Sequence, residues 1–94
     1  MDLFDAVCSD DLELVRTLLE SGQDPNIFED SARITPLHYA VQNDNPYIAD
    51  TLLYYGANIK AKTVDGKTPL GIALTHNALK TVLILALYLE NKLK

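Results

Sequence analysis

The stretch "TPLHYA" at residues 35–40 returns 33 positions later as "TPLGIA" at residues 68–73. The threonine of each copy, Thr35 or Thr68, is a predicted helix N-cap, because its hydroxyl can accept a hydrogen bond from an amide of the first turn that has no partner within the helix. The proline that follows stands at the first helical position, where its missing N–H costs nothing and its fixed φ suits the helix. Each copy therefore predicts the start of a helix.

The same period runs through the rest of the chain. It is carried by Leu3, Leu37 and Leu70, by Ala6, Ala40 and Ala73, and by Gly22 and Gly56. Between these markers apolar residues recur at helical spacing, and the glycines can take the left-handed conformation that ends a helix. A period near 33 indicates stacked helical units, none of which can bury its apolar face alone. The sequence predicts an all-α solenoid of three helix-turn-helix units with hairpin-like linking loops.

These motifs, together with "DGKTPL" at residues 65–70 and "GANIKA" at residues 56–61, resemble the ankyrin repeat. The segment "DDLELVRTLLESGQDPN" at residues 10–26 resembles the second helix of that repeat and its following loop. The resemblance implies a single ankyrin-repeat domain. Its expected bounds are 1–94, with repeats at 1–28, 29–61 and 62–94.

The chain departs from the pattern of the family at three places. Arg33 stands where the later hairpin has Gly66, one residue is inserted into the loop before it, and Gly71 replaces the histidine found at His38. We expect the hairpin before the second repeat to be distorted and the third repeat to be less conventional.

Charge is distributed unevenly along the chain. Residues 1–34 hold nine acidic and two basic side chains, a net charge of −7, whereas residues 62–94 carry a net charge of +3. Nucleic acid would meet a repelling surface over the first third of the chain, so a nucleic-acid partner is not predicted.

The composition and the N-terminal residues bear on location. The most apolar run, "VLILALYL" at residues 82–89, is far shorter than the roughly 18 residues that a membrane-spanning helix needs. The start "MDLFDAVCSDDLE" has acids where an export signal would have basic and then apolar residues. The single cysteine, Cys8, excludes an internal disulfide and fits a reducing compartment. We expect an intracellular, cytoplasmic protein with no membrane partner.

The residues do not assemble into a predicted catalytic or metal site. Cys8 and His38 lie at different points of consecutive repeats with no third group, so Cys8 is interpreted as a small core thiol and His38 as a histidine bonded to the backbone of its turn. His76 is interpreted as a contact residue rather than a metal ligand, and the N-terminal acids as a solvated face. No enzyme activity and no cofactor are predicted.

The resemblance implies a scaffold-like module that binds a partner protein on a concave face made by first helices and hairpin tips. The positions that match are Glu29, Ser31, Ala32, Ile34, Gln42 and Asn43 in the second repeat, and Lys62, Val64, Asp65, Lys67, Thr75 and His76 in the third. Tyr39, Tyr47, Tyr54 and Tyr55 are further candidates, because tyrosine is enriched in interface hot spots.

The last predicted helix carries an unusual set of leucines. Alignment with the first repeat places Val82, Leu85 and Ala86 in the core, and Leu83 and Leu87 at positions that are charged in the first repeat. The helix could rotate or bend to cover the core, it could form a dimer, or a further repeat could cover it. The alternative function is therefore an assembly subunit that self-associates through this helix, and the chain is expected to be a monomer or a weak homodimer.

Overall fold

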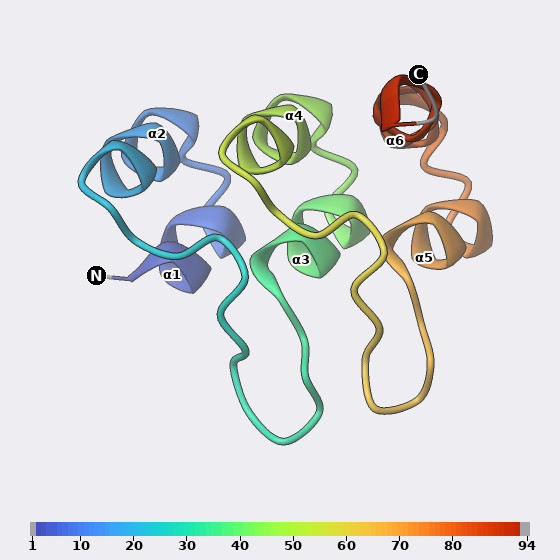
Figure 1. The fold of residues 1–94 in the computed structure, drawn as a ribbon, viewed down its shortest axis with the longest axis horizontal. Coiled ribbons are helices and arrows are strands. Elements are labelled where there is room, and N and C mark those ends of the chain that lie inside the picture. The colour runs from blue at the N-terminus through green and yellow to red at the C-terminus, as the bar shows by residue number, and fades with distance from the viewer. Residues whose placement is uncertain (1, 93–94) are drawn as a thin grey trace.

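The computed structural model describes residues 2–92 and contains six α-helices. They are α1 (Leu3–Cys8), α2 (Leu12–Glu20), α3 (Pro36–Gln42), α4 (Pro46–Tyr54), α5 (Pro69–Thr75) and α6 (Leu79–Lys92). Figure 1 shows α1, α3 and α5 side by side in one layer and α2, α4 and α6 in a second layer above them. The long loops before α3 and α5 extend beyond the first layer. The described residues form no strand, which confirms the predicted all-α fold.

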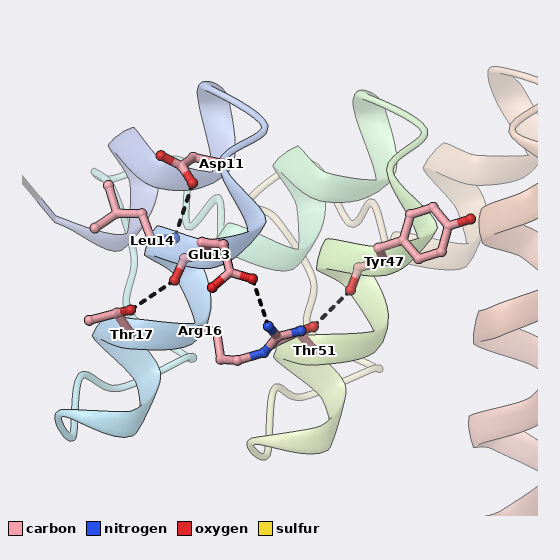
Figure 2. A network of polar contacts seen from close by, with 7 residues as sticks. All are labelled: Asp11, Glu13, Leu14, Arg16, Thr17, Tyr47 and Thr51. Carbon is pink, nitrogen blue, oxygen red and sulfur yellow. Dashed lines mark hydrogen bonds and ion pairs between the residues drawn. The ribbon is translucent and has the colours of Figure 1, made fainter.

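The helices begin where the capping residues predict. The hydroxyl of Thr35 accepts a hydrogen bond from His38 N at 3.4 Å, and that of Thr68 accepts one from Gly71 N at 3.1 Å. Figure 2 shows the corresponding bond at α2, where Asp11 Oδ1 accepts from Leu14 N at 3.1 Å. Each bond satisfies an amide that the helix itself leaves without a partner.

Short left-handed turns reverse the chain inside each helix pair. Asp10, Asp44 and Asn77 have φ values of +55°, +49° and +56°, and each lies two residues after the end of its first helix. Aspartate and asparagine tolerate this conformation better than most residues do. Gly22 and Gly56 have φ values near +100° just beyond α2 and α4, which confirms that glycine ends both helices.

The hairpin before α3 keeps its turn although it lacks a glycine. Arg33 takes φ +61° where the later hairpin has Gly66 at φ +81°, and its N–H donates to Asp30 O at 3.1 Å. The closing bond of the first hairpin runs from Glu29 N to Ile34 O, which spans one residue more than its counterpart in the second hairpin. The expected distortion is therefore limited to a longer closing loop and one unfavourable backbone conformation.

A single apolar core runs along the stack of helix pairs. The middle helix α4 has helix pairs on both sides, and its residues Ile48, Ala49, Leu52 and Leu53 are all buried. On α6, Leu85 is fully buried, which confirms its predicted core position. The prediction that Ala86 lies in the core is wrong, and Val82 is only half-buried. Both face the end of the stack, where the described residues provide no further helix pair.

The outward leucines of α6 remain outside the core. Leu83 is 61% exposed and Leu87 is 48% exposed, so α6 has not rotated to cover the core, and the first of the three accounts of this helix is wrong. Tyr88 holds α6 against α4, because its hydroxyl donates to Asp50 Oδ1 at 2.7 Å. Partial burial, with this bond, raises the pKa of Tyr88 to about 12.

The stacked core predicts the cost of truncating a buried leucine. Leu52→Ala removes a fully buried side chain and should lower the free energy of unfolding by about 2 to 5 kcal/mol. Urea unfolding followed by circular dichroism measures the loss. The matched control Leu83→Ala removes the same atoms from an exposed position and should change stability by about 0.5 kcal/mol or less. Equal losses of unfolding free energy in the two variants would contradict the assignment of Leu52 to the core and of Leu83 to the surface.

Candidate binding groove

A groove opens between the two hairpins and the inner helix layer. It has a volume of about 220 Å³ and is formed by α3, α5 and both hairpin loops. Its lining residues are Ala32, Ile34, His38, Gln42, Thr63, Asp65, Lys67, Ile72 and His76. An adjoining hollow against α5 shares Lys67 and His76 and adds Thr75. The groove has apolar side chains in its wall and polar groups at its rim.

Two hydrogen bonds fix the hairpins that form this groove. Val64 N in the second hairpin donates to Ala32 O in the first at 2.8 Å. The side chain of His38, on α3, contacts Lys67 O at 3.0 Å through Nε2. The first bond joins the hairpins to each other and the second joins a hairpin to the helix layer. The groove is therefore formed before any partner arrives.

His38 is a structural residue at the base of the groove. Thr35 N donates to His38 Nδ1 at 3.1 Å, so Nδ1 is the acceptor and the ring proton lies on Nε2, from which it is donated to Lys67 O. Burial lowers the pKa of His38, and the bond to the Lys67 carbonyl opposes this shift. These contacts confirm the interpretation of His38 as a residue bonded to its turn. At the equivalent position of α5, Gly71 offers no side chain for such a bond.

Several predicted contact residues lie together in or beside the groove. Ile34, Gln42, Asp65, Lys67 and His76 line it, and Thr75 lies in the adjoining hollow. Val64 and Ser31 are exposed on the hairpins.

Other predicted residues lie elsewhere. Lys62 lines a hollow on another side of the hairpins, with Phe28 and Arg33. Asn43 lies at the turn between α3 and α4. Tyr47 and Tyr54 are exposed on α4 in the outer layer.

Tyr39 and Glu29 are engaged with each other. The Tyr39 hydroxyl donates to Glu29 Oε2, and the tyrosine ring packs edge-on against Phe4 with ring centroids 5.9 Å apart. The hydrogen bond to Glu29, with burial, raises the pKa of Tyr39 to about 12. This pair therefore ties the first hairpin to α3, and the Phe4 contact ties α3 to α1.

The sequence did not single out Thr63 and Ile72 as groove residues. Ile72 lies one helical turn before His76 at the end of α5, so the periodicity of α5 could have placed both on one side. Thr63 faces the groove because its backbone closes the second hairpin, and no helical pattern carries that information.

Cys8 is exposed, so its interpretation as a core thiol is wrong. It is the last residue of α1, the position that Gln42 holds on α3 and Thr75 on α5, and all three side chains lie outside the core. Partial burial and then the nearby carboxylates, Glu29 foremost, raise the pKa of the Cys8 thiol. A thiol with a raised pKa is a poor nucleophile.

Within residues 2–92, no three His, Cys, Asp or Glu side chains gather as a potential metal site. Over the same residues, none of the helices combines the length and apolar character that crossing a membrane requires.

The sequence and the fold match those of known proteins. The family model described as ankyrin repeats (3 copies) matches residues 3–94, and the chain belongs to the ankyrin-repeat family. The crystal structure of the human ASB11 ankyrin repeat domain superposes with a TM-score of 0.84 at 29% sequence identity, covering 92% of this chain and 38% of that one. Ankyrin-repeat domains are typically non-catalytic modules of protein–protein interaction.

Longer proteins contain similar segments. The chain is 37% identical over 78 residues to the 2-5A-dependent ribonuclease of Homo sapiens, and 42% identical over 66 residues to a putative ankyrin repeat protein of fowlpox virus. These matches cover 83% and 70% of this chain. The chain spans only 10% of the ribonuclease and 19% of the viral protein.

The buried histidine predicts how stability changes with pH. The folded pKa of His38 lies below its ordinary value of 6.5, so the unfolded chain takes up the proton first as pH falls, and stability that is present above pH 6.5 is lost on acidification. His38→Gln should lower the free energy of unfolding by about 1 to 3 kcal/mol at neutral pH, because buried bonds are lost.

The difference in the free energy of unfolding between wild type and His38→Gln should shrink as the pH falls from about 7.5 to about 5.5, because only the wild type has an imidazole at position 38 to protonate. Urea unfolding at both pH values measures it. A difference that stays constant or grows on acidification would contradict the buried, neutral state of His38.

Proposed function

We propose that the chain is a non-catalytic scaffold module that binds a partner protein in the groove between its hairpins and its inner helices. The observation that carries this proposal is the convergence of side chains from four segments on one preformed groove. A groove with an apolar wall and a few polar groups at its rim suits a short segment of another protein.

The lining suggests the chemistry of that segment. Ile34 and Ile72 offer an apolar surface, while Asp65 and Lys67 present opposite charges on the same hairpin. A partner segment with one apolar side chain flanked by groups of both charges would satisfy all four residues. Gln42 and His76 can add hydrogen bonds from the helix side.

The free thiol of Cys8 is compatible with the intracellular, cytoplasmic location that the sequence predicts.

The exposed leucines of α6 favour a second role, in which copies of the chain associate with one another.

Affinity capture with a groove variant tests the binding role. The triple variant Gln42→Ala, Lys67→Ala and His76→Ala removes three exposed side chains and should stay folded, with each change costing about 0.5 kcal/mol or less. Proteins captured by the wild type should be lost, and the affinity of an isolated partner should fall at least about tenfold.

The control variant Lys60→Ala with Lys62→Ala changes the hollow on another side of the hairpins and should capture the same proteins as the wild type. If the control loses the partner and the groove variant keeps it, the binding site lies in that hollow and the proposed groove is wrong.

A further inference from the structure

The two ends of the stack leave equivalent positions unequally buried. In the inner layer, Val7 on α1 and Val41 on α3 are fully buried, whereas Leu74 at the same position of α5 is 61% exposed. The helix pairs of Val7 and Val41 are each followed by another pair, and in the described residues that of Leu74 is not. Leu74 therefore belongs to a surface that the following pair covers on α1–α2 and α3–α4 and that is uncovered on α5–α6.

The outer layer repeats this pattern. Val15 and Ala49 are fully buried, while the equivalent Val82 is only half-buried. Leu19 and Leu53, which are buried on α2 and α4, correspond to the exposed Ala86. The α5–α6 end thus presents the same apolar surface that α1–α2 and α3–α4 use to contact the next pair.

The opposite end presents the complementary surface. On α6, Thr81 and Leu85 face the preceding pair and are fully buried, as Ile48 and Leu52 are on α4. The equivalent residues of α2, Leu14 and Leu18, are only half-buried. Figure 1 places α1–α2 and α5–α6 at the two ends of the stack, so the two uncovered surfaces point in opposite directions.

We propose that copies of this chain associate head to tail, with the α5–α6 end of one copy packed on the α1–α2 end of the next. Val82 and Ala86 on α6 of one copy would contact Leu14 and Leu18 on α2 of the next, and Leu74 on α5 would face α1 of the next, in the same way that consecutive helix pairs contact each other within the chain. The contact lies at the ends of the stack and does not involve the groove of the proposed partner.

The groove between α4 and α6 shows which residues of the outer helix layer would meet at such a contact. A groove between these helices is lined by Pro46, Tyr47 and Asp50 from α4 and by Lys80, Leu83 and Ile84 from α6. Tyr47 extends from α4 toward α6 in Figure 2. One helix pair further along the stack, α6 takes the place of α4, and α2 of the next copy takes the place of α6.

This shift brings opposite charges together. Lys80 takes the position of Tyr47, and Glu13 of the next copy takes the position that Lys80 holds within the chain. Leu79 and Leu83 would line the same groove, opposite the aliphatic part of Arg16 and the methyl group of Thr17 of the next copy. Part of the apolar surface of α6 that packing within the chain leaves exposed would be covered.

The distribution of charge favours this arrangement over a symmetric one. The first third of the chain has a net charge of −7 and the last third has +3, so head-to-tail contact places unlike charges opposite each other. A symmetric dimer through two α6 helices would place the positively charged ends together. A head-to-tail dimer leaves one unpaired surface at each of its ends, so the assemblies grow with concentration beyond the dimer.

Two variants, each blocking one end, test the proposal. Leu14→Glu with Leu18→Glu blocks the α1–α2 end, and Leu74→Lys with Val82→Lys blocks the α5–α6 end. Sedimentation velocity of the wild type from low micromolar to millimolar concentration should show an average mass that rises beyond that of a dimer. Each variant alone should remain a monomer. An equimolar mixture of the two should form dimers and nothing larger, because one intact surface of each kind remains.

A charge exchange keeps the test valid if a blocked variant fails to fold, because it changes only exposed residues. Glu13→Lys should weaken the association by about fivefold, and adding Lys80→Glu should restore it. The control Lys60→Glu, away from both ends, should leave the association unchanged.

Two results would overturn the proposal. A wild type that is monomeric throughout the concentration range would show that the ends do not attract each other. Dimers of the variant blocked at α1–α2 would show that two α6 helices pair with each other instead.

Discussion

Apolar packing between consecutive helix pairs is the interaction on which the rest of the structure depends. A pair such as α3–α4 has helices of only seven and nine residues, which are too short to be stable in isolation. They persist because α4 is covered by α2 on one side and by α6 on the other, so that Ile48 and Leu52 are fully buried. The stability of each pair therefore belongs to its contacts with its neighbours. This also explains why residues of equal character differ in burial between the middle of the stack and its ends.

The groove depends on the same packing through a small number of polar contacts. The hairpins have no apolar core of their own, and they are positioned by the bond between Val64 N and Ala32 O and by the contact of His38 with Lys67 O. His38 is itself fixed by the start of α3, where Thr35 bonds its ring. The positions of Asp65 and Lys67 at the rim thus depend on helix packing, because His38 on α3 bonds the backbone of their hairpin at Lys67 O. A partner that binds there gains affinity because the groove is ordered before binding.

Much of the fold follows from the sequence because its signals are local and periodic. A threonine followed by proline identifies a helix start, and the spacing of Leu85 places it in the core, as the structure confirms. Repeat alignment fails for Ala86, since it gives the direction in which a side chain points and not whether a neighbour lies there. The interpretation of Cys8 as a core thiol rested on its residue type, whereas its alignment with Gln42 and Thr75 indicates an outward position. Direction alone also could not reveal that Tyr39 bonds Glu29, because that contact depends on how a loop of irregular backbone folds back onto α3.

The leucines of α6 raise a question that repeat packing alone does not answer. Leu83 holds the position that Asp50 holds on α4, and Asp50 remains exposed although α6 packs beside it. Burial by a following helix pair therefore does not require a leucine at this position, since a carboxylate is tolerated there. Leu83 instead makes this position of α6 apolar, where the equivalent Asp50 makes it polar on α4. Leu83 also lies beside Lys80, in the third of the chain that carries a net positive charge. A contact that uses both properties must offer apolar surface and negative charge together, and the α1–α2 end, with Leu14 and Leu18 beside Glu13, has both.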